Sequence, residues 1–154
     1  MSLIKEAAVA PAQESGWFYT ADRTPVLRYE LEQAGQVLHV EWQYGPGIDD
    51  VKQGFLELAR LLRENRTPVL LSDSNHYEGD WSELIPWVRY EVLPTAIDHG
   101  LRYLVDVLPS DPASSLAIFS WREETRDVLQ HEVFHSLDAA RQWIREQLLS
   151  RDGQ

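Results

Sequence analysis

Apolar and polar residues alternate in two segments near the start of the chain. Residues 26–32 and residues 36–44 each place apolar side chains at about every second position, which is typical of strands with one buried face. Residues 34–36, Ala-Gly-Gln, predict a turn between them, so we expect a β-hairpin. Residues 17–19, Trp-Phe-Tyr, predict either a short edge strand or aromatic side chains that pack across the hairpin.

Beyond the hairpin the apolar residues follow helical spacing. Residues 48–65 carry them at positions i, i+3 and i+4, which predicts an amphipathic helix with one buried face. The same spacing predicts a second helix over residues 80–97, with a kink or an end at Pro94, because proline lacks the N–H group that a helix interior needs. Asp111 followed by Pro112 predicts the N-cap and the first residue of a third helix.

Short apolar segments lie between these helices. Residues 69–71 and residues 101–108 are typical of strands, the first of them buried on both faces. Ser136 predicts the N-cap of a final helix. This order predicts an α/β fold, in which an N-terminal β-hairpin is followed by alternating helices and strands in a mixed, mostly parallel sheet flanked by helices. We expect one domain at residues 16–150, after a flexible leader at residues 1–15.

Composition and charge narrow the possible functions. The chain has 154 residues, enough for a substantial core, with 25 acidic and 14 basic residues and a formal net charge of −11. This charge repels phosphate backbones and anionic lipids, so we expect neither nucleic-acid binding nor membrane insertion. The absence of cysteine excludes disulfides and thiol catalysis, and no cofactor is expected. A cytoplasmic location is the default, because no apolar run is long enough to span a bilayer.

The order of the elements resembles the SpoIIAA-like group of STAS domains, the anti-sigma-factor antagonist fold, and in particular its small bacterial stand-alone members. Besides the hairpin, the resemblance is carried by Arg-Thr-Pro-Val-Leu-Leu-Ser-Asp at residues 66–73, by residues 87–94 and by the closing pattern at residues 133–144. It covers residues 25–149 and implies a regulatory or protein-interaction module without catalytic activity. It also implies that residues 132–136 form the last strand.

The sequence His131-Glu132-Val133-Phe134-His135 contains the H-E-x-x-H signature of zinc proteases. On a helix the two histidines share one face and can bind one zinc ion, with the glutamate as general base. On a strand they lie about 13 Å apart, too far for a single ion. Because Ser136 begins a helix directly after the motif, we interpret the segment as a strand and the match as accidental. A zinc metalloenzyme that uses His131, Glu132 and His135 is the less favoured alternative.

The polar loop that follows residues 69–71 is the predicted binding site, because ligands of open α/β sheets bind beyond the carboxyl ends of strands. The candidate residues for ligand or partner binding are Asp73, Ser74, His76, Tyr77, Asp80 and Trp81. In the STAS regulators that this chain resembles, a serine or threonine near this helix start is phosphorylated by a partner kinase, and Ser74 and Ser82 are the corresponding positions. Alternatively, Asp80 and Ser82 simply cap the helix, and Asp73 and Ser74 form an Asx-type turn.

The remaining predictions concern Asp106, two tryptophans, the partner and a second possible function. Asp106 interrupts an otherwise apolar strand, which is typical either of a buried acid with a shifted pKa or of an edge-facing position, and we favour the second interpretation. Trp17 and Trp81 are flanked by polar residues, which favours a role as anchors of an interface. The expected partner is another protein or a second copy of the chain. A second hypothesis is binding of a small apolar ligand, which the similarity of this fold to CRAL-TRIO lipid-transfer domains implies.

Overall fold

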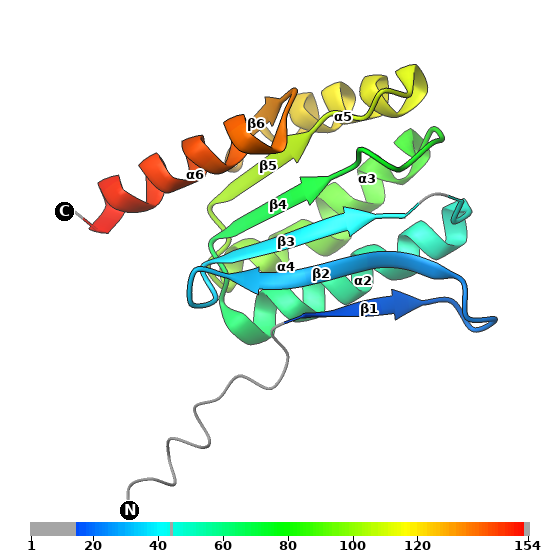
Figure 1. Ribbon diagram of the computed structural model, residues 1–154, viewed down its shortest axis with the longest axis horizontal. Coiled ribbons are helices and arrows are strands. Elements are labelled where there is room, and N and C mark those ends of the chain that lie inside the picture. Colours follow the sequence, from blue (N-terminus) through cyan, green and yellow to red (C-terminus); the bar gives the residue numbers. More distant parts are fainter. Residues whose placement is uncertain (1–14, 44, 153–154) are drawn as a thin grey trace, which may run out of the picture.

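The computed structural model describes residues 15–43 and 45–152, and the surroundings of side chains through residue 150. Its six strands form one sheet in the order β1-β2-β3-β4-β5-β6 (Figure 1). β1 to β3 pair antiparallel and β3 to β6 pair parallel, so the predicted α/β fold with a mixed sheet is confirmed. The strands are β1 Ser15–Tyr19, β2 Pro25–Glu32, β3 Val37–Trp42, β4 Val69–Asp73, β5 Tyr103–Val107 and β6 Gln130–Phe134.

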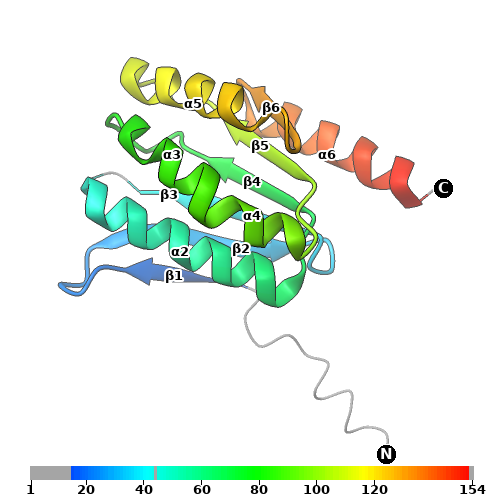
Figure 2. The same ribbon diagram turned by 180° about the vertical axis from the view of Figure 1, so that it is seen from behind.

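Helices lie on both faces of the sheet. The helices that connect the parallel strands all cover the same face of the sheet (Figure 2). Each new parallel strand lies next to the previous one in the same direction across the sheet, and right-handed crossovers then place every connecting helix on one face. The last helix, α6, packs on β4, β5 and β6 from the opposite side. The helical segments are α2 Ile48–Asn65, η1 Ser82–Leu84, α3 Ile85–Trp87, η2 Val88–Val92, α4 Leu93–Asp98, α5 Pro112–Thr125 and α6 Leu137–Asp152.

The local signals in the sequence have the predicted effects. The carboxylate of Asp111 accepts a hydrogen bond from the backbone N–H of Ser114 at 3.1 Å, and the hydroxyl of Ser136 accepts one from Ala139 at 3.1 Å. Both predicted N-caps are therefore confirmed. The kink expected at Pro94 takes the form of the π-helical turn η2, in which the N–H of Leu93 bonds to the carbonyl of residue 88.

Strand boundaries differ from the prediction by about two residues. β4 continues through Asp73, which the sequence placed in a loop, because Ser72 and Asp73 pair with β5 as well as β3. β6 covers residues 130–134 instead of 132–136. Of the predicted leader, residues 1–14 lie outside the described residues, and Ser15 is the first residue of β1.

Two apolar cores hold the layers together. The larger one fills the space between the sheet and the helices α2 to α5, and α2 rests directly on an aromatic ring. A methyl group added at Gly54 would approach the ring of Trp42 to 2.8 Å, so only glycine permits this contact. The smaller core lies between α6 and the strands beneath it. Among the described residues, no helix has both the length and the apolar character needed to cross a membrane.

Candidate functional site

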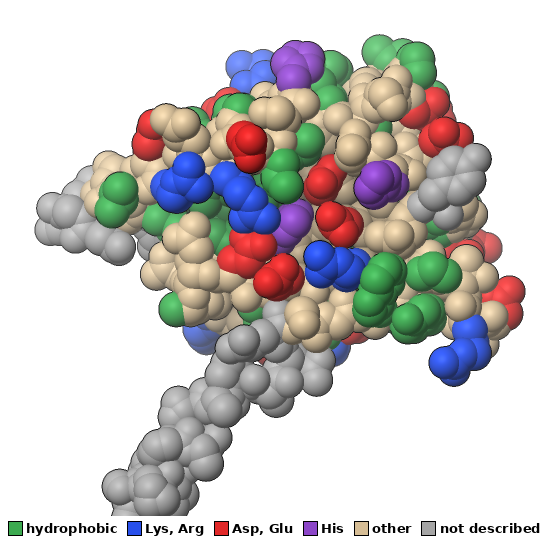
Figure 3. Space-filling view, viewed as in Figure 1, with side chains coloured by type: hydrophobic (Ala, Val, Ile, Leu, Met, Phe, Trp, Pro, Cys, Tyr) green, Lys and Arg blue, Asp and Glu red, His purple; other side chains and the backbone are tan. Residues whose placement is uncertain are grey.

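Because α6 packs mainly on β4 to β6 and reaches only the start of β3, most of the sheet formed by β1 to β3 has no described helix over it on that side. Residues opposite one another in antiparallel strands share a face, which places the pairs Trp17–Arg28, Arg28–Glu41 and Glu30–His39 together there. Figure 3 shows charged side chains gathered on this face beside α6. We define the open sheet face by Trp17, Tyr19, Arg28, Glu30, Glu32, His39, Glu41 and Asp73.

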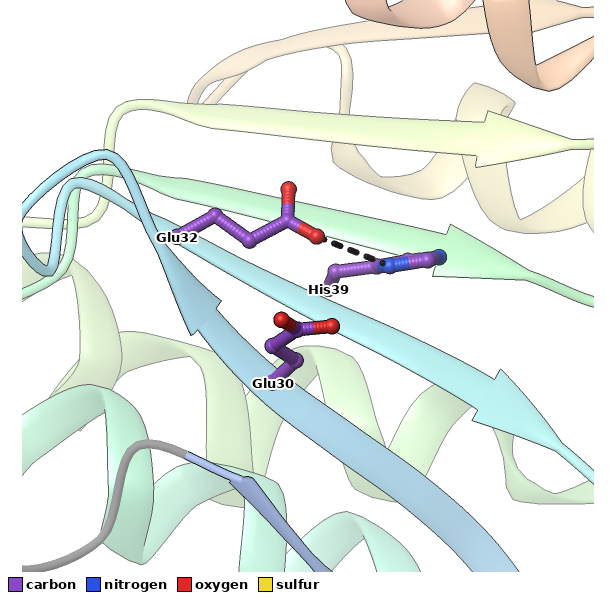
Figure 4. Close-up of side chains that lie close together, drawn as sticks. All are labelled: Glu30, Glu32 and His39. Carbon is purple, nitrogen blue, oxygen red and sulfur yellow. Dashed lines mark hydrogen bonds and ion pairs between the residues drawn. The ribbon is translucent and has the colours of Figure 1, made fainter.

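A buried histidine lies at the centre of the open sheet face. Nδ1 of His39 is 3.2 Å from Oε2 of Glu32, and Figure 4 shows the ring beside the carboxylates of Glu30 and Glu32. Arg141 reaches across from α6, and its Nη2 atom donates to the same Glu32 oxygen at 3.0 Å, while its Nη1 atom bonds to Oε1. The guanidinium thus fixes the Glu32 carboxylate, which in turn orients the imidazole.

The Glu32–Arg141 pair makes stability depend on pH. Burial raises the pKa of the Glu32 carboxyl, but the hydrogen bonds and charge of Arg141, together with His39, outweigh it and bring this pKa below its ordinary value of 4.5. A carboxyl whose pKa is lowered on folding contributes stability above the pKa of the unfolded chain, and this contribution is lost as the pH falls through the folded value. The contribution is therefore complete at neutral pH and disappears below about pH 4.5.

Glu32→Gln is expected to lower the free energy of unfolding by about 1–3 kcal/mol at neutral pH, and the difference from wild type is expected to shrink as the pH falls below about 4.5. Urea unfolding at a series of pH values measures both. Glu64→Gln on α2 is the control, because its ion pair with Arg60 is exposed and contributes about 0–1 kcal/mol. A Glu32→Gln effect that stays constant into strong acid would contradict this role of the carboxylate.

The predicted loop site divides into a buried and an exposed part. Ser74, Tyr77 and Trp81 are buried, as is Asp73 at the end of β4, whereas His76 and Asp80 are exposed. Asp73 Oδ1 accepts a hydrogen bond from the backbone N–H of Asn75 at 2.9 Å, so Asp73 does form the expected Asx-type turn. The six candidates therefore do not converge on one surface, and Asp73 points to the open sheet face instead.

The two candidate phosphorylation sites differ in access. Ser74 is buried, so a kinase could reach its hydroxyl only after the loop opened. Ser82 is half-buried at the start of η1, and its N–H donates to Oδ1 of Asp80 at 2.9 Å in an Asx-type turn, but the N-cap residue of η1 is Trp81 and no side chain caps this helix. Ser82 is thus the more accessible of the two positions.

A small cavity lies between the sheet and the helices that cover it. Its volume is about 50 Å³, and Ser74, Tyr77 and Trp81 line it together with apolar residues of α2 and Asp106 of β5. An apolar cavity of roughly 150 Å³ holds a single benzene molecule, so a cavity a third of that size is too small for a lipid chain. The hypothesis of a bound apolar ligand gains no support from it.

The H-E-x-x-H segment is a strand, as the prediction for its backbone required. His131 is buried, with Nε2 2.5 Å from Oδ2 of Asp106 and Nδ1 2.7 Å from the hydroxyl of Thr125, whereas His135 is exposed beyond the end of β6. Both ring nitrogens of His131 are therefore engaged within the core. The interpretation of Asp106 as edge-facing is wrong, because it lies on an interior strand and is buried against His131.

The open sheet face went unrecognised in the sequence, although the signal for it was present. Polar residues at every second position, Arg28, Glu30 and Glu32 on one strand and His39 and Glu41 on the next, mark one face of the predicted hairpin. Such a face is usually only solvated, and the pattern does not tell which strands the last helix leaves uncovered. Comparison with protein-family models, curated proteins and solved structures finds no match to this chain.

Proposed function

We propose that this chain is a non-catalytic protein-interaction module of the SpoIIAA-like STAS type, and that it binds an extended, basic segment of a partner protein along β1 and over the open sheet face. The observation that carries the proposal is the contrast between the two edges of the sheet. Exposed edge strands can pair with another chain, and proteins usually protect them with charged side chains or cover them.

The edge formed by β6 is protected. Arg122 of α5 donates from Nε to the backbone carbonyl of His131 at 2.8 Å, and its Nη2 atom lies 3.8 Å from the carboxylate of Glu132. The Arg122 side chain therefore uses a backbone acceptor that an added strand would need, and it places charge at the β6 edge. α5 and α6 also pack on β6 from opposite faces of the sheet. A further strand finds little room to pair there.

The edge formed by β1 has none of this protection among the described residues. Its sequence, Ser-Gly-Trp-Phe-Tyr, contains no charged residue and no proline, and no described strand lies outside it. Trp17 is 47% exposed and Tyr19 is 46% exposed, and their rings stack with centroids 6.2 Å apart. An extended peptide that paired with β1 would gain backbone hydrogen bonds and contact with these rings.

Charge indicates the chemistry of the partner. The open sheet face carries four carboxylates, from Glu30, Glu32, Glu41 and Asp73, against two guanidinium groups, from Arg28 and Arg141, and the chain as a whole has a net charge of −11. Lysine or arginine side chains on the partner would complement these carboxylates and stack on the exposed aromatic rings. A second copy of the chain would present the same acidic face, so repulsion opposes a homodimer through this surface.

Selection of short random peptides displayed on phage, with the full chain as bait, tests the proposal. We expect enrichment of sequences in which lysine or arginine alternates with β-branched or aromatic residues. Synthetic peptides from the selected set should bind at least about 10-fold more weakly to Trp17→Ser and Tyr19→Ser, which corresponds to the loss of about 1.4 kcal/mol. Leu116→Ser is the control, because Leu116 is 70% exposed on α5, away from β1.

Three outcomes would contradict the proposal. The first is a selection that enriches no peptides, or only acidic ones. The second is binding that depends on Leu116 instead of Trp17. The third is a concentration-dependent dimer in sedimentation experiments that Trp17→Ser abolishes, which would show that a second copy occupies β1.

A further inference from the structure

A buried nitrogen in the open sheet face has no hydrogen-bond partner among the residues that the structure describes. His39 is only 6% exposed, and its Nε2 atom is buried without a hydrogen bond to any described residue. Buried polar atoms nearly always have a hydrogen-bond partner, because desolvation without compensation costs free energy. The environment of Nε2 therefore points to a group that binds it.

The other ring nitrogen, Nδ1, contacts both a carboxylate and a guanidinium group. Oε2 of Glu32 lies 3.2 Å from Nδ1, and Nη2 of Arg141 lies 3.0 Å from that oxygen and 3.1 Å from Nδ1 itself. The carboxylate of Glu32 only accepts hydrogen bonds and the guanidinium of Arg141 only donates them, so Nδ1 either donates to Glu32 or accepts from Arg141. In the tautomer that carries the proton on Nδ1 and donates it to Glu32, Nε2 has a free lone pair, and this is the form that binds a cation.

That lone pair is directed towards two carboxylates. Figure 4 shows that the end of the His39 ring opposite Glu32 points along β3 towards the carboxyl end of that strand. Glu41 lies there, two residues further along the same face, and it pairs with Asp73 across β3 and β4. One ligand atom from each of His39, Glu41 and Asp73 lies within 4.8 Å of the other two. Three electron-rich atoms thus converge where a cation would stabilise all of them.

We infer that Nε2 of His39 and the carboxylates of Glu41 and Asp73 form a binding site for a divalent transition-metal ion, for which Zn²⁺ is the best match. Imidazole nitrogen is a preferred ligand of zinc and its neighbours, whereas Mg²⁺ and Ca²⁺ favour sites built of oxygen atoms. Three protein ligands with a fourth position for water or a partner's side chain are common for zinc.

The residues around these ligands match the surroundings of metal-binding histidines. Such histidines usually donate their second N–H to a carboxylate, which is the position of Glu32. The carboxylate ligands are oriented as well. Nε of Arg28 lies 3.3 Å from Oε1 of Glu41, and the N–H of Asn75 donates to Oδ1 of Asp73 at 2.9 Å.

A second group, Glu30, Glu32 and His39, also brings three ligand atoms within 4.8 Å of one another, but it is the weaker candidate. It would have to use Nδ1 of His39 and the carboxylate of Glu32, and both already contact the guanidinium of Arg141. A cation there would compete with Arg141 at two of its three ligands, whereas in the favoured group only Glu41 is paired, with Arg28, and Nε2 has no hydrogen-bond partner among the described residues.

Isothermal titration calorimetry of the chelator-treated full chain with ZnCl₂ tests this site. We expect one zinc ion per chain, bound at least about 10-fold more tightly than Mg²⁺ or Ca²⁺. His39→Gln and Asp73→Asn are each expected to weaken zinc binding by at least about 10-fold. Loss of a residue that only orients a metal ligand already weakens binding by about 10-fold or more, and these two variants lose a ligand itself. Glu30→Gln and His135→Gln are the matched controls and should bind zinc as the wild type does.

X-ray absorption of the zinc-loaded wild-type chain provides a readout that does not depend on how well the variants fold. We expect one imidazole nitrogen and otherwise oxygen ligands at about 2.0–2.2 Å. Absence of stoichiometric zinc binding, or a spectrum with two imidazoles, would overturn the inference. Zinc binding that survives His39→Gln and Asp73→Asn would also overturn it. Loss of binding in His135→Gln would place the ion at the H-E-x-x-H segment instead, and loss of binding in Glu30→Gln would place it at the second group.

Discussion

Asp106→Ala is expected to lower the free energy of unfolding by about 3–5 kcal/mol, because it leaves His131 buried without its acidic partner. Oδ2 of Asp106 lies 2.5 Å from Nε2 of His131, and the imidazole is fully buried. On the other side of the ring, the hydroxyl of Thr125 lies 2.7 Å from Nδ1 and donates a hydrogen bond to the backbone carbonyl of Trp121 at 3.1 Å. Every member of this network is satisfied, so removing one member leaves the others desolvated without compensation.

Urea unfolding followed by circular dichroism measures this effect, with Asp98→Ala on the exposed side of α4 as the control. The control should change stability by about 0.5 kcal/mol or less. Replacing both partners, in Asp106→Leu with His131→Leu, removes both polar groups and is expected to lose less stability than Asp106→Leu alone. A free energy of unfolding for Asp106→Ala that lies within about 1 kcal/mol of the wild-type value would show that the Asp106–His131 pair does not stabilise the fold.

Trp81→Ala is expected to lower the free energy of unfolding by about 3–5 kcal/mol, because its ring lies in the middle of an aromatic row through the larger core. The centroid of the Trp81 ring is 5.6 Å from that of Phe55 and 6.1 Å from that of Trp121, and only 7% of the residue is exposed. Truncation would enlarge the adjoining cavity of about 50 Å³ and remove contacts on two sides.

Trp17→Ala is the matched control for Trp81→Ala, because the sequence predicted both tryptophans as interface anchors. Trp17 is half-exposed on β1, so its truncation should change stability by about 1 kcal/mol or less. The two variants therefore separate a core tryptophan from a surface one by equilibrium unfolding. Equal, small losses for both would mean that Trp81 does not pack as the structure shows.

Most of the fold could be predicted because the evidence for it is local in the sequence. Alternation identified β2 and β3, helical spacing identified α2, and two N-cap residues, Asp111 and Ser136, fixed the starts of α5 and α6. The same cap at Ser136 led to the correct strand conformation for the H-E-x-x-H segment. Signals of this kind depend on residues a few positions apart, so one sequence is enough to show them.

Burial at the site could not be predicted, because it depends on which distant elements meet. Trp81 has polar neighbours in the sequence, but Phe55 of α2 and Trp121 of α5 pack against it in the larger core. Asp106 interrupts an apolar strand, yet its partner His131 lies 25 residues away on the next strand. The partnerless nitrogen of His39 has the same origin, since it depends on how β3 lies beside β4 and on the reach of Arg141 from α6.

The central claim is that partners bind at β1 and the open sheet face. Nuclear magnetic resonance of the isotope-labelled full chain, titrated with a lysine-alternating peptide from the phage selection, tests it most directly. The account predicts that the largest backbone amide shifts fall in residues 15–19, together with the indole signal of Trp17, and that β6 is unaffected. Shifts centred on β6 or on α5, with residues 15–19 unchanged, would contradict it.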